Sequence, residues 1–261
     1  MNNSIFALMV IYNKNCNNSV TYKALKEIKS INIIVCDNST KDYGNSAVVE
    51  ADNNIYIDMH GNKGLSKAYN SALDRLFQEK KNGIVCMFDD DTETPLEYFS
   101  ELAEISEDES WDICLPRVFN KAWMMSPCEF NKYHVRKISD LNKCDTRYLV
   151  GINSGMAIRL NLFENYRYDE NLFLDFVDFN FMLDMRKRNA KIKVMATKLY
   201  QDFSVLTHDK EAAKARYKIK KKDLDYFYKN GIISKLYLFV LKLKLKIKIF
   251  LKFKDITSFL W

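Results

Sequence analysis

The sequence contains few of the residues that interrupt regular structure. Among 261 residues there are only 7 glycines and 3 prolines, whereas hydrophobic residues make up 48% and charged residues 28%. Disordered, collagenous and repeat-array chains have a different balance, so these classes do not fit. The length corresponds to one large domain with ample room for a buried core, and at most a small appendage.

Long apolar runs and metal-binding cysteine motifs are also absent. No stretch of 18 apolar residues exists, and the apolar segment Ser4–Tyr12 has no basic region before it, so we expect neither secretion nor a membrane span. The six cysteines form no CxxC pair, which argues against a zinc site. Cys36, Cys86 and Cys114 fall within apolar runs and are expected to be reduced core residues of a cytoplasmic protein.

The net charge of +6 is unevenly distributed. Residues 209–261 contain 15 basic and 5 acidic residues, whereas residues 1–208 contain 25 basic and 29 acidic residues. A mildly acidic body is therefore followed by a basic end. Such an end attracts anionic lipid headgroups or nucleic acid, and charge by itself does not distinguish the two.

Short apolar runs separated by helical patterns predict an α/β fold with a mostly parallel sheet. Helical periodicity follows Gly64, and a second helix is expected to begin with Thr94 as N-cap and Pro95 at its first position. Ligands of such sheets bind beyond the carboxyl ends of the strands. The expected strands are residues 4–12, 31–36, 55–57, 83–88 and 191–195.

Three consecutive carboxylates, Asp89, Asp90 and Asp91, directly follow the strand expected to end at Phe88. Carboxylates this close repel each other unless a cation lies between them. A divalent ion held by one or two carboxylates and by phosphate oxygens is typical of phosphate-handling enzymes. The alternative is a solvated acidic turn before the next helix.

Five short segments, taken in order, favour the enzyme. They are Tyr12-Asn13, Asp37-Asn38-Ser39, Asn62–Asn70, Phe88–Thr92 and Asn171–Asp178. In these segments the sequence resembles family 2 glycosyltransferases of the GT-A fold, and particularly their bacterial rhamnosyltransferase and galactofuranosyltransferase-like branch. The resemblance covers about residues 5–208 and implies a Rossmann-like, mostly parallel sheet flanked by helices.

The resemblance implies that the first four segments bind the nucleotide. Gly64 is expected to let the backbone approach the nucleotide at a helix N-terminus, which favours phosphate, and a plain turn glycine is the alternative. Asp90 occupies the variable middle position of the family's metal motif and alternatively faces solvent. The implied nucleotide-binding residues are Tyr12, Asn13, Asp37, Asn38, Asn62, Gly64, Leu65, Asn70, Asp89 and Asp90.

The resemblance also implies a metal ion, a base and an acceptor site. Asp91 and His208 match the metal ligands of this branch, so Mn²⁺ or Mg²⁺ is expected, although a lone histidine is more often a surface or packing residue. Inverting transfer needs a carboxylate that takes the acceptor proton while the diphosphate leaves from the opposite face. Asp178 matches that base and Asp175 is the nearby alternative, and either could also cap the following helix. Ser154-Gly155 resembles the acceptor-side turn.

These features predict a GT-A domain over residues 1–210, with a nucleotide-binding half (1–115) and an acceptor-binding half (116–210). The expected activity is metal-dependent, inverting transfer of rhamnose or galactofuranose from a UDP- or dTDP-linked donor to a lipid-linked saccharide, in bacterial surface polysaccharide synthesis. One alternative is a nucleotidyltransferase, but no glycine follows the first strand in residues 13–17. The other is a non-catalytic nucleic-acid-binding protein, which the acidic body disfavours.

The basic end, residues 211–261, is expected to lie on the inner face of the cell membrane or to form a dimer contact. Lysines alternate with apolar residues from Lys242 to Lys248, which is the period of a strand, yet lysine and leucine favour helices. Lysines beside leucine and phenylalanine are typical of segments that lie on a bilayer surface. The secondary structure of this end stays open from the sequence.

Overall fold

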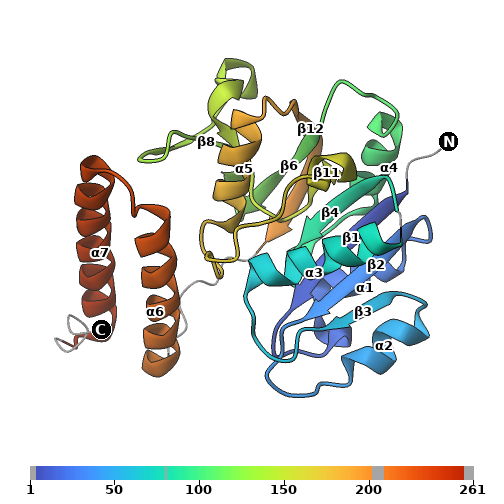
Figure 1. The fold of residues 1–261 in the computed structure, drawn as a ribbon, viewed down its shortest axis with the longest axis horizontal. Helices are drawn as coiled ribbons and strands as arrows, with labels where there is room; N and C mark the ends of the chain where they lie inside the picture. Colours follow the sequence, from blue (N-terminus) through green and yellow to red (C-terminus); the bar gives the residue numbers. More distant parts are fainter. Residues whose placement is uncertain (1–3, 80, 202–208, 256–261) are drawn as a thin grey trace.

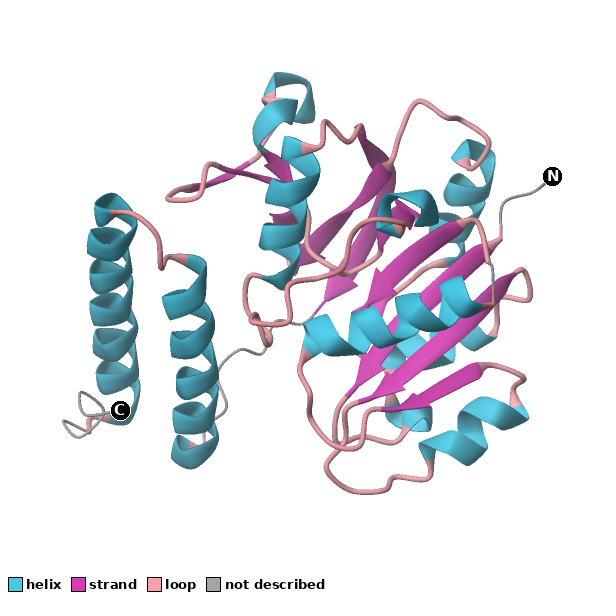
Figure 2. Ribbon diagram, viewed as in Figure 1, coloured by secondary structure: helices cyan, strands magenta, loops and turns pink. Residues whose placement is uncertain are grey.

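The computed structural model describes residues 4–79, 81–201 and 209–255. A mostly parallel sheet forms the centre of the molecule (Figures 1 and 2), as the sequence predicts. Only β5, β7 and β11 run antiparallel to their neighbours. In spatial order the strands are β3 (Ile55–Asp58), β2 (Ile31–Asp37), β1 (Ile5–Ile11), β4 (Ile84–Phe88), β11 (Met156–Arg159), β6 (Ile113–Asn120), β12 (Ile192–Gln201) and β5 (Thr92–Glu93), and β7 (Trp123–Ser126) pairs with β6.

Helices cover both faces of this sheet, because its central strands are apolar on both sides. Alternate residues of β1 face opposite cores: Phe6 and Leu8 pack on one side, and Ala7 and Met9 on the other. Helices α3 (Leu65–Gln78) and α5 (Val177–Lys187) cover the first side. Helices α1 (Val20–Lys26), α2 (Asn45–Ala51) and α4 (Leu96–Ile105) cover the second.

A smaller antiparallel sheet lies within the segment between β7 and β11. It consists of β10 (Leu149–Val150), β8 (Cys128–Phe130) and β9 (Val135–Lys137), and it packs beside α5. Single 3-10 turns complete the body. They are η1 (Cys16–Asn18), η2 (Leu141–Lys143), η3 (Thr146–Tyr148) and η4 (Leu160–Phe163).

The predicted start of α4 and the predicted end of β12 differ from the structure. Helix α4 begins after Pro95, and the Thr94 hydroxyl donates to the Thr92 carbonyl instead of capping the helix. Strand β12 continues to Gln201 although its middle is polar. It shifts register between Val194 and Lys198, and the Glu101 side chain accepts the backbone N–H groups that the shift frees.

The basic end forms a helical hairpin, α6 (Lys210–Phe227) and α7 (Ile232–Phe253), which resolves the choice between strand and helix. The turn contains Gly231 at φ +90°, a conformation that favours glycine. The hairpin lies at the side of the body that carries α5 and β8 (Figure 1). Within the described ranges, no helix combines the length and the apolar character needed to cross a membrane.

The cysteines agree with the core prediction. All six are free thiols, and Cys36, Cys86 and Cys114 are buried in the sheet. Burial raises the pKa of each of these three thiols to about 12, so they stay protonated and act as small hydrophobic side chains.

Candidate active site

The carboxyl ends of β1, β2 and β4 lie side by side and bring three polar segments together. The backbone N–H of Asn13 donates to Ser39 Oγ (2.9 Å), and Asn13 Oδ1 accepts the N–H of Thr40 (2.9 Å). Lys14 Nζ lies 2.8 Å from a carboxylate oxygen of Asp90. The three polar segments therefore converge at one edge of the sheet, and Asp90 forms an ion pair rather than facing only solvent.

Helix α1 holds the acidic turn after β4 in place. The Thr21 hydroxyl donates to the carbonyl of Asp89 (2.6 Å), and the Ser19 hydroxyl donates to that of Asp90 (2.7 Å). Both hydroxyl residues are fully buried. Since the carbonyls are satisfied inside the protein, the three carboxylates are displayed at a fixed position beyond the strand.

Gln201, at the end of β12, links the first and last of these carboxylates. Its Nε2 donates to Asp91 Oδ1 (2.7 Å) and to Asp89 Oδ2 (3.1 Å). Burial and the charge of Asp91 raise the pKa of Asp89 to about 6, and burial also raises the pKa of Asp91. The pair is therefore costly to ionise without a cation, which is the electrostatic condition that favours a bound divalent ion.

The donor set fits Mn²⁺ or Mg²⁺, which prefer oxygen ligands. Asp91 and Asp89 supply carboxylate oxygens close together, and the Gln201 amide lies between them. Across the residues that the structure describes, no cluster of three or more His, Cys, Asp or Glu side chains is placed to hold a metal. The predicted ligand His208 lies outside the described residues.

Asp37 is buried at the end of β2, and its carboxylate accepts hydrogen bonds from other groups of the protein. Its hydrogen-bond donors come from the loop after β2, from the first residue of α2 and from the neighbouring strand β3. Tyr12, by contrast, is half exposed beside this cluster. The donors to Asp37 are the Ser39 N–H (2.9 Å), Asn45 Nδ2 (2.8 Å) and the Tyr56 hydroxyl (3.1 Å).

Asparagine side chains shape the turn that leads into α3. Asn38 Nδ2 donates to the carbonyl of Gly64 (3.2 Å), and Asn38 Oδ1 accepts the N–H of Lys63 (3.2 Å). Asn62 Oδ1 accepts the N–H of Gly64 (3.2 Å). Asn38 and Asn62 therefore fix the backbone of this turn, and their predicted contacts with a nucleotide remain predictions.

The close contact that Gly64 permits is to Phe173. A Cβ at Gly64 would lie 2.7 Å from both the ring and the carbonyl oxygen of Phe173, and the φ of Gly64 is +88°. The N–H of Leu65 donates to that carbonyl (2.7 Å), and the Ser66 hydroxyl donates to the Leu172 carbonyl (2.7 Å). The first turn of α3 is thus covered by the chain's own loop. The predicted approach of the Gly64 backbone to a nucleotide remains a prediction.

Asn70 has the same partner segment. Its Oδ1 accepts the N–H of Tyr168 (2.8 Å), and its Nδ2 donates to the Tyr168 carbonyl (3.0 Å) and to Glu170 (3.1 Å). Asn70 is buried, so its amide joins the two halves of the body. Its predicted nucleotide contact remains a prediction.

The two candidate bases have different surroundings. Asp175 forms ion pairs with Arg216, whose Nη2 donates over 2.8 Å, and with Lys220 at 3.5 Å. Asp178 is partly buried at the start of α5 and accepts the N–H of Phe179 (2.8 Å), without an ion-pair partner in the described part of the chain. Burial, with the nearby charge of Asp89, raises the pKa of Asp178 to about 7. A carboxylate with this pKa can both accept and hold a proton near neutral pH.

Two buried polar atoms lie near the acidic turn and Asp178. Asn153 Oδ1 and the Tyr69 hydroxyl make no hydrogen bond of ordinary length and angle among the described residues, although the Asn153 side chain lies close to the Tyr69 hydroxyl. Burial raises the pKa of Tyr69, and the charges of Asp89 and Asp178 act in the same direction. Buried polar groups are normally satisfied, so this position is suited to a bound polar ligand.

Ser154, predicted on the acceptor side, is fully buried next to the acidic turn. Its hydroxyl donates to Asp89 Oδ2 (3.3 Å) and also contacts Gln201 Oε1. Gly155 has φ +78°, and a Cβ there would lie 2.4 Å from Leu199. The turn therefore supports Asp89 directly, and its acceptor-binding role remains a prediction.

Sequence reasoning missed Asp223 of α6, which fixes the loop that precedes Asp178. The fully buried Asp223 carboxylate accepts three backbone N–H groups, those of Phe173 (2.9 Å), Leu174 (2.9 Å) and Asp175 (2.8 Å). Its position within a lysine-rich run gave no sign of burial. Sequence reasoning also missed Gln201, which no local motif marks.

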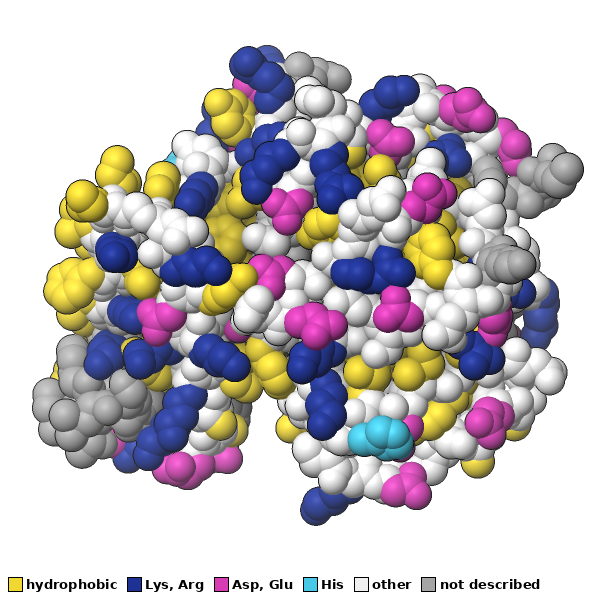
Figure 3. All heavy atoms as spheres, in the orientation of Figure 1, with side chains coloured by type: hydrophobic (Ala, Val, Ile, Leu, Met, Phe, Trp, Pro, Cys, Tyr) yellow, Lys and Arg dark blue, Asp and Glu magenta, His cyan; other side chains and the backbone are white. Residues whose placement is uncertain are grey.

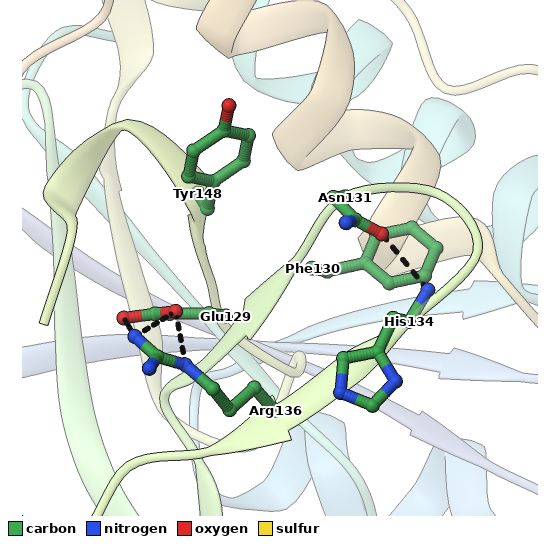
Figure 4. Close-up of a pocket in the computed structure, with 6 residues that line it drawn as sticks. All are labelled: Glu129, Phe130, Asn131, His134, Arg136 and Tyr148. Atoms are coloured by element: carbon green, nitrogen blue, oxygen red, sulfur yellow. Dashed lines mark hydrogen bonds and ion pairs between the residues drawn. The ribbon is translucent and has the colours of Figure 1, made fainter.

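A cavity of about 310 Å³ opens beside α5 (Figure 4). The stacked rings of Phe130 and Phe179 (4.8 Å between centroids) join it to the residue after Asp178. Within it, Arg136 forms a two-point hydrogen-bonded pair with Glu129 (2.6 Å for each bond). The lining residues are Glu129, Phe130, Asn131, His134, Arg136 and Tyr148.

Comparison with known proteins places this chain in a family. Residues 7–167 match glycosyl transferase family 2. The chain is 29% identical over 187 residues to the dTDP-rhamnosyl transferase RfbF of Shigella flexneri, a match that covers 68% of this chain and 62% of that protein. The chain thus spans less than two thirds of the relative's length.

Solved structures share the GT-A fold at low sequence identity. The crystal structure of S. aureus TarS 1-349 in complex with UDP-GlcNAc has a TM-score of 0.55 at 14% identity, covering 96% of this chain and 73% of that one. GalNAc-T7 with UDP, GalNAc and Mn²⁺ has a TM-score of 0.58 at 13% identity, covering 95% and 55%. Mannosyl-3-phosphoglycerate synthase from Rubrobacter xylanophilus has a TM-score of 0.55 at 13% identity, covering 86% and 74%. On its sequence match and its fold, the chain belongs to glycosyl transferase family 2.

Proposed function

We propose that this protein transfers a sugar, rhamnose or galactofuranose, from a UDP- or dTDP-linked donor to a saccharide hydroxyl. The observation that carries this proposal is the pairing of two carboxylate systems: Asp89 and Asp91 beyond β4, and Asp178 with its raised pKa at the start of α5. The first suits a cation and a diphosphate, and the second suits a proton acceptor. The relative that transfers dTDP-rhamnose favours rhamnose.

In the proposed inverting reaction, the acceptor oxygen bonds to the anomeric carbon as the bond to the diphosphate breaks. Asp178 takes the hydroxyl proton, and the nucleoside diphosphate is released as the other product. Mn²⁺ or Mg²⁺ on Asp91, with Asp89 and His208 as further candidate ligands, would neutralise the charge of the diphosphate. Asp175 is less suited to be the base, because its carboxylate is already paired with Arg216 and Lys220.

The acceptor in this proposal is a lipid-linked saccharide of bacterial surface polysaccharide synthesis, met at the inner face of the cell membrane. The cavity beside α5 supports a saccharide, because it combines an aromatic ring, Tyr148, with polar side chains such as Asn131 and His134. The basic hairpin supports a membrane location, and a dimer contact through it is the alternative. The branch resemblance, rather than the described geometry, is what points to surface polysaccharides.

The donor site is tested by calorimetric titration with UDP and dTDP, each with and without Mn²⁺. We expect binding that requires Mn²⁺ and is lost in Asp91→Asn, and the preferred base identifies the donor class. Asp58→Asn is the matched control, since Asp58 is an exposed carboxylate at the end of the neighbouring strand β3. Failure of the folded protein to bind either nucleotide would sink the proposal, and salt-sensitive nucleic-acid binding unaffected by Asp91→Asn would favour the non-catalytic alternative.

A further inference from the structure

Helix α7 exposes an unusual amount of apolar surface. Of the large hydrophobic side chains that are exposed in the described residues, half lie on this one helix. Figure 3 shows hydrophobic side chains gathered over α7 at the left edge of the molecule. The exposed residues are Ile232, Ile233, Leu236, Phe239, Val240, Leu243, Ile247 and Leu251.

These residues form one continuous stripe, here called the α7 stripe. Apart from the adjacent pairs 232/233 and 239/240, they are spaced by three or four residues. This spacing keeps them on one side of a helix that turns by about 100° per residue. On the same geometry, lysines border the α7 stripe on both sides. Lys235, Lys242 and Lys246 follow one border, and Lys244 and Lys248 follow the other.

The α7 stripe faces away from the body, because the opposite side of α7 contacts the body and the first helix of the hairpin. Ser234 is buried, and its hydroxyl lies 2.8 Å from that of Tyr133 in the β8–β9 turn. The rings of Tyr237 and Tyr228 contact each other with centroids 5.2 Å apart, and Lys242 forms an ion pair with Asp225 of α6. The stripe therefore cannot turn inward without breaking these contacts.

We propose that the α7 stripe lies in the interface of an anionic lipid bilayer, parallel to its surface. An apolar stripe bordered by lysines matches a surface in which acyl chains lie beneath negative headgroups. A second copy of this chain is a poorer partner, since the lysine borders of two stripes packed together would face each other and repel. A bilayer span is disfavoured by the lysines around the helix.

This inference deepens the proposed function by naming the surface through which the enzyme meets the membrane. The hairpin is fixed to the loop before Asp178 through Asp223, and to the β8–β9 turn through Tyr133. Docking of the α7 stripe would therefore hold the acceptor side of the body, which carries Asp178, at a constant position relative to the lipid.

The test is co-sedimentation of the full chain with vesicles of phosphatidylcholine, with and without phosphatidylglycerol. We expect at least about tenfold tighter binding to the anionic vesicles, weakening with salt. The triple variant Leu236→Glu, Phe239→Glu and Leu243→Glu should lose that binding. Leu96→Glu, a matched change at an exposed leucine of α4, should keep it.

Two further measurements keep the outcomes distinct. Calorimetric titration with UDP or dTDP on the same variants reports the donor site, so loss of vesicle binding with unchanged nucleotide binding concerns the α7 stripe alone. Light scattering after gel filtration reports oligomers. The inference is overturned if the folded wild-type chain ignores anionic vesicles, if the triple variant binds them as well as the wild type, or if the stripe holds a dimer that the triple variant dissociates.

Discussion

Asp175 and Asp178 are chemically identical side chains three residues apart, yet the protein surrounds them differently. Asp175 has two cationic neighbours, whereas partial burial and the charge of Asp89 raise the pKa of Asp178 to about 7. From the sequence alone the two were alternatives, because the distinguishing cations, Arg216 and Lys220, come from a distant helix. We therefore propose Asp178, rather than Asp175, as the base.

Replacement of Asp178 with asparagine should therefore remove proton transfer to this side chain. We expect the rate of sugar transfer by Asp178→Asn to fall by about 10²- to 10⁴-fold, with nucleotide affinity unchanged. Asp184→Asn is the matched control, because Asp184 lies on the same helix and pairs with Lys187 away from the acidic turn. A variant of Asp178 that keeps full activity would assign the base elsewhere.

The same substitution should stabilise the fold at neutral and alkaline pH. The folded-state pKa of Asp178, about 7, exceeds the ordinary aspartate value of 3.8. The folded protein thus binds more protons than the unfolded chain between these values, so the free energy of unfolding falls as pH rises through this window. Asparagine removes that penalty. Thermal melting at pH 5 and pH 8 should show the difference between Asp178→Asn and wild type grow with pH, and a difference that shrinks would contradict the assignment.

At the residue scale, the sequence located the acidic turn but not its supports. Asp89, Asp90 and Asp91 were predictable because a strand-length apolar run ends directly before them. Gln201 and Ser154 lie on β12 and before β11, whose places in the sheet depend on contacts between distant segments. No local spacing records such pairings, so both contacts to Asp89 were invisible.

At the scale of elements, the start of α3 and the Leu172–Phe173 backbone act as one unit, joined at Gly64. Gly64→Ala should lower the free energy of unfolding by about 1–3 kcal/mol more than Gly61→Ala, because its Cβ overlaps Phe173. Gly61 is the matched control: it has φ +98° and open space around the added Cβ. Chemical denaturation measures both, and equal losses would mean that backbone strain alone matters at Gly64.

Helix α6 should likewise hold the loop that precedes Asp178 in position. Asp223→Asn keeps only one carbonyl oxygen to accept three N–H groups, so we expect faster hydrogen exchange at Phe173, Leu174 and Asp175 and a lower kcat. Nucleotide affinity should be unaffected. Asp225→Asn, a change on the same helix that touches only the pair with Lys242, is the control. Unchanged exchange in Asp223→Asn would show that other contacts suffice.

The elements that the sequence predicts well are those whose pattern is unambiguous. The strands β1, β2 and β4 are apolar on both faces and end abruptly at polar residues. Strand β12 was predicted too short, because its polar middle is stabilised by Glu101 from another element. The alternation from Lys242 to Lys248 suggested a strand, but these residues lie within helix α7. A helix forms its backbone hydrogen bonds within itself and needs no partner strand.

At the scale of the whole molecule, the predicted nucleotide-binding and acceptor-binding halves are closely joined. Asn70 binds Tyr168, Ser66 binds Leu172, and β4 pairs with β11 across the boundary. We therefore expect a single cooperative unfolding transition, measured identically by far-UV circular dichroism and tyrosine and tryptophan fluorescence. Two separate transitions would show that the halves are independent domains.

The carboxylate of Asp223 has a practical consequence for how the protein can be trimmed. Residues 7–167 carry the family match, so removal of everything after Asp209 would leave that match intact. It would also strip three N–H groups of their acceptor just before Asp178. The apolar surface of α7 is better removed by replacing its outward leucines and phenylalanine than by cutting off the hairpin, because α6 also supports the loop before Asp178.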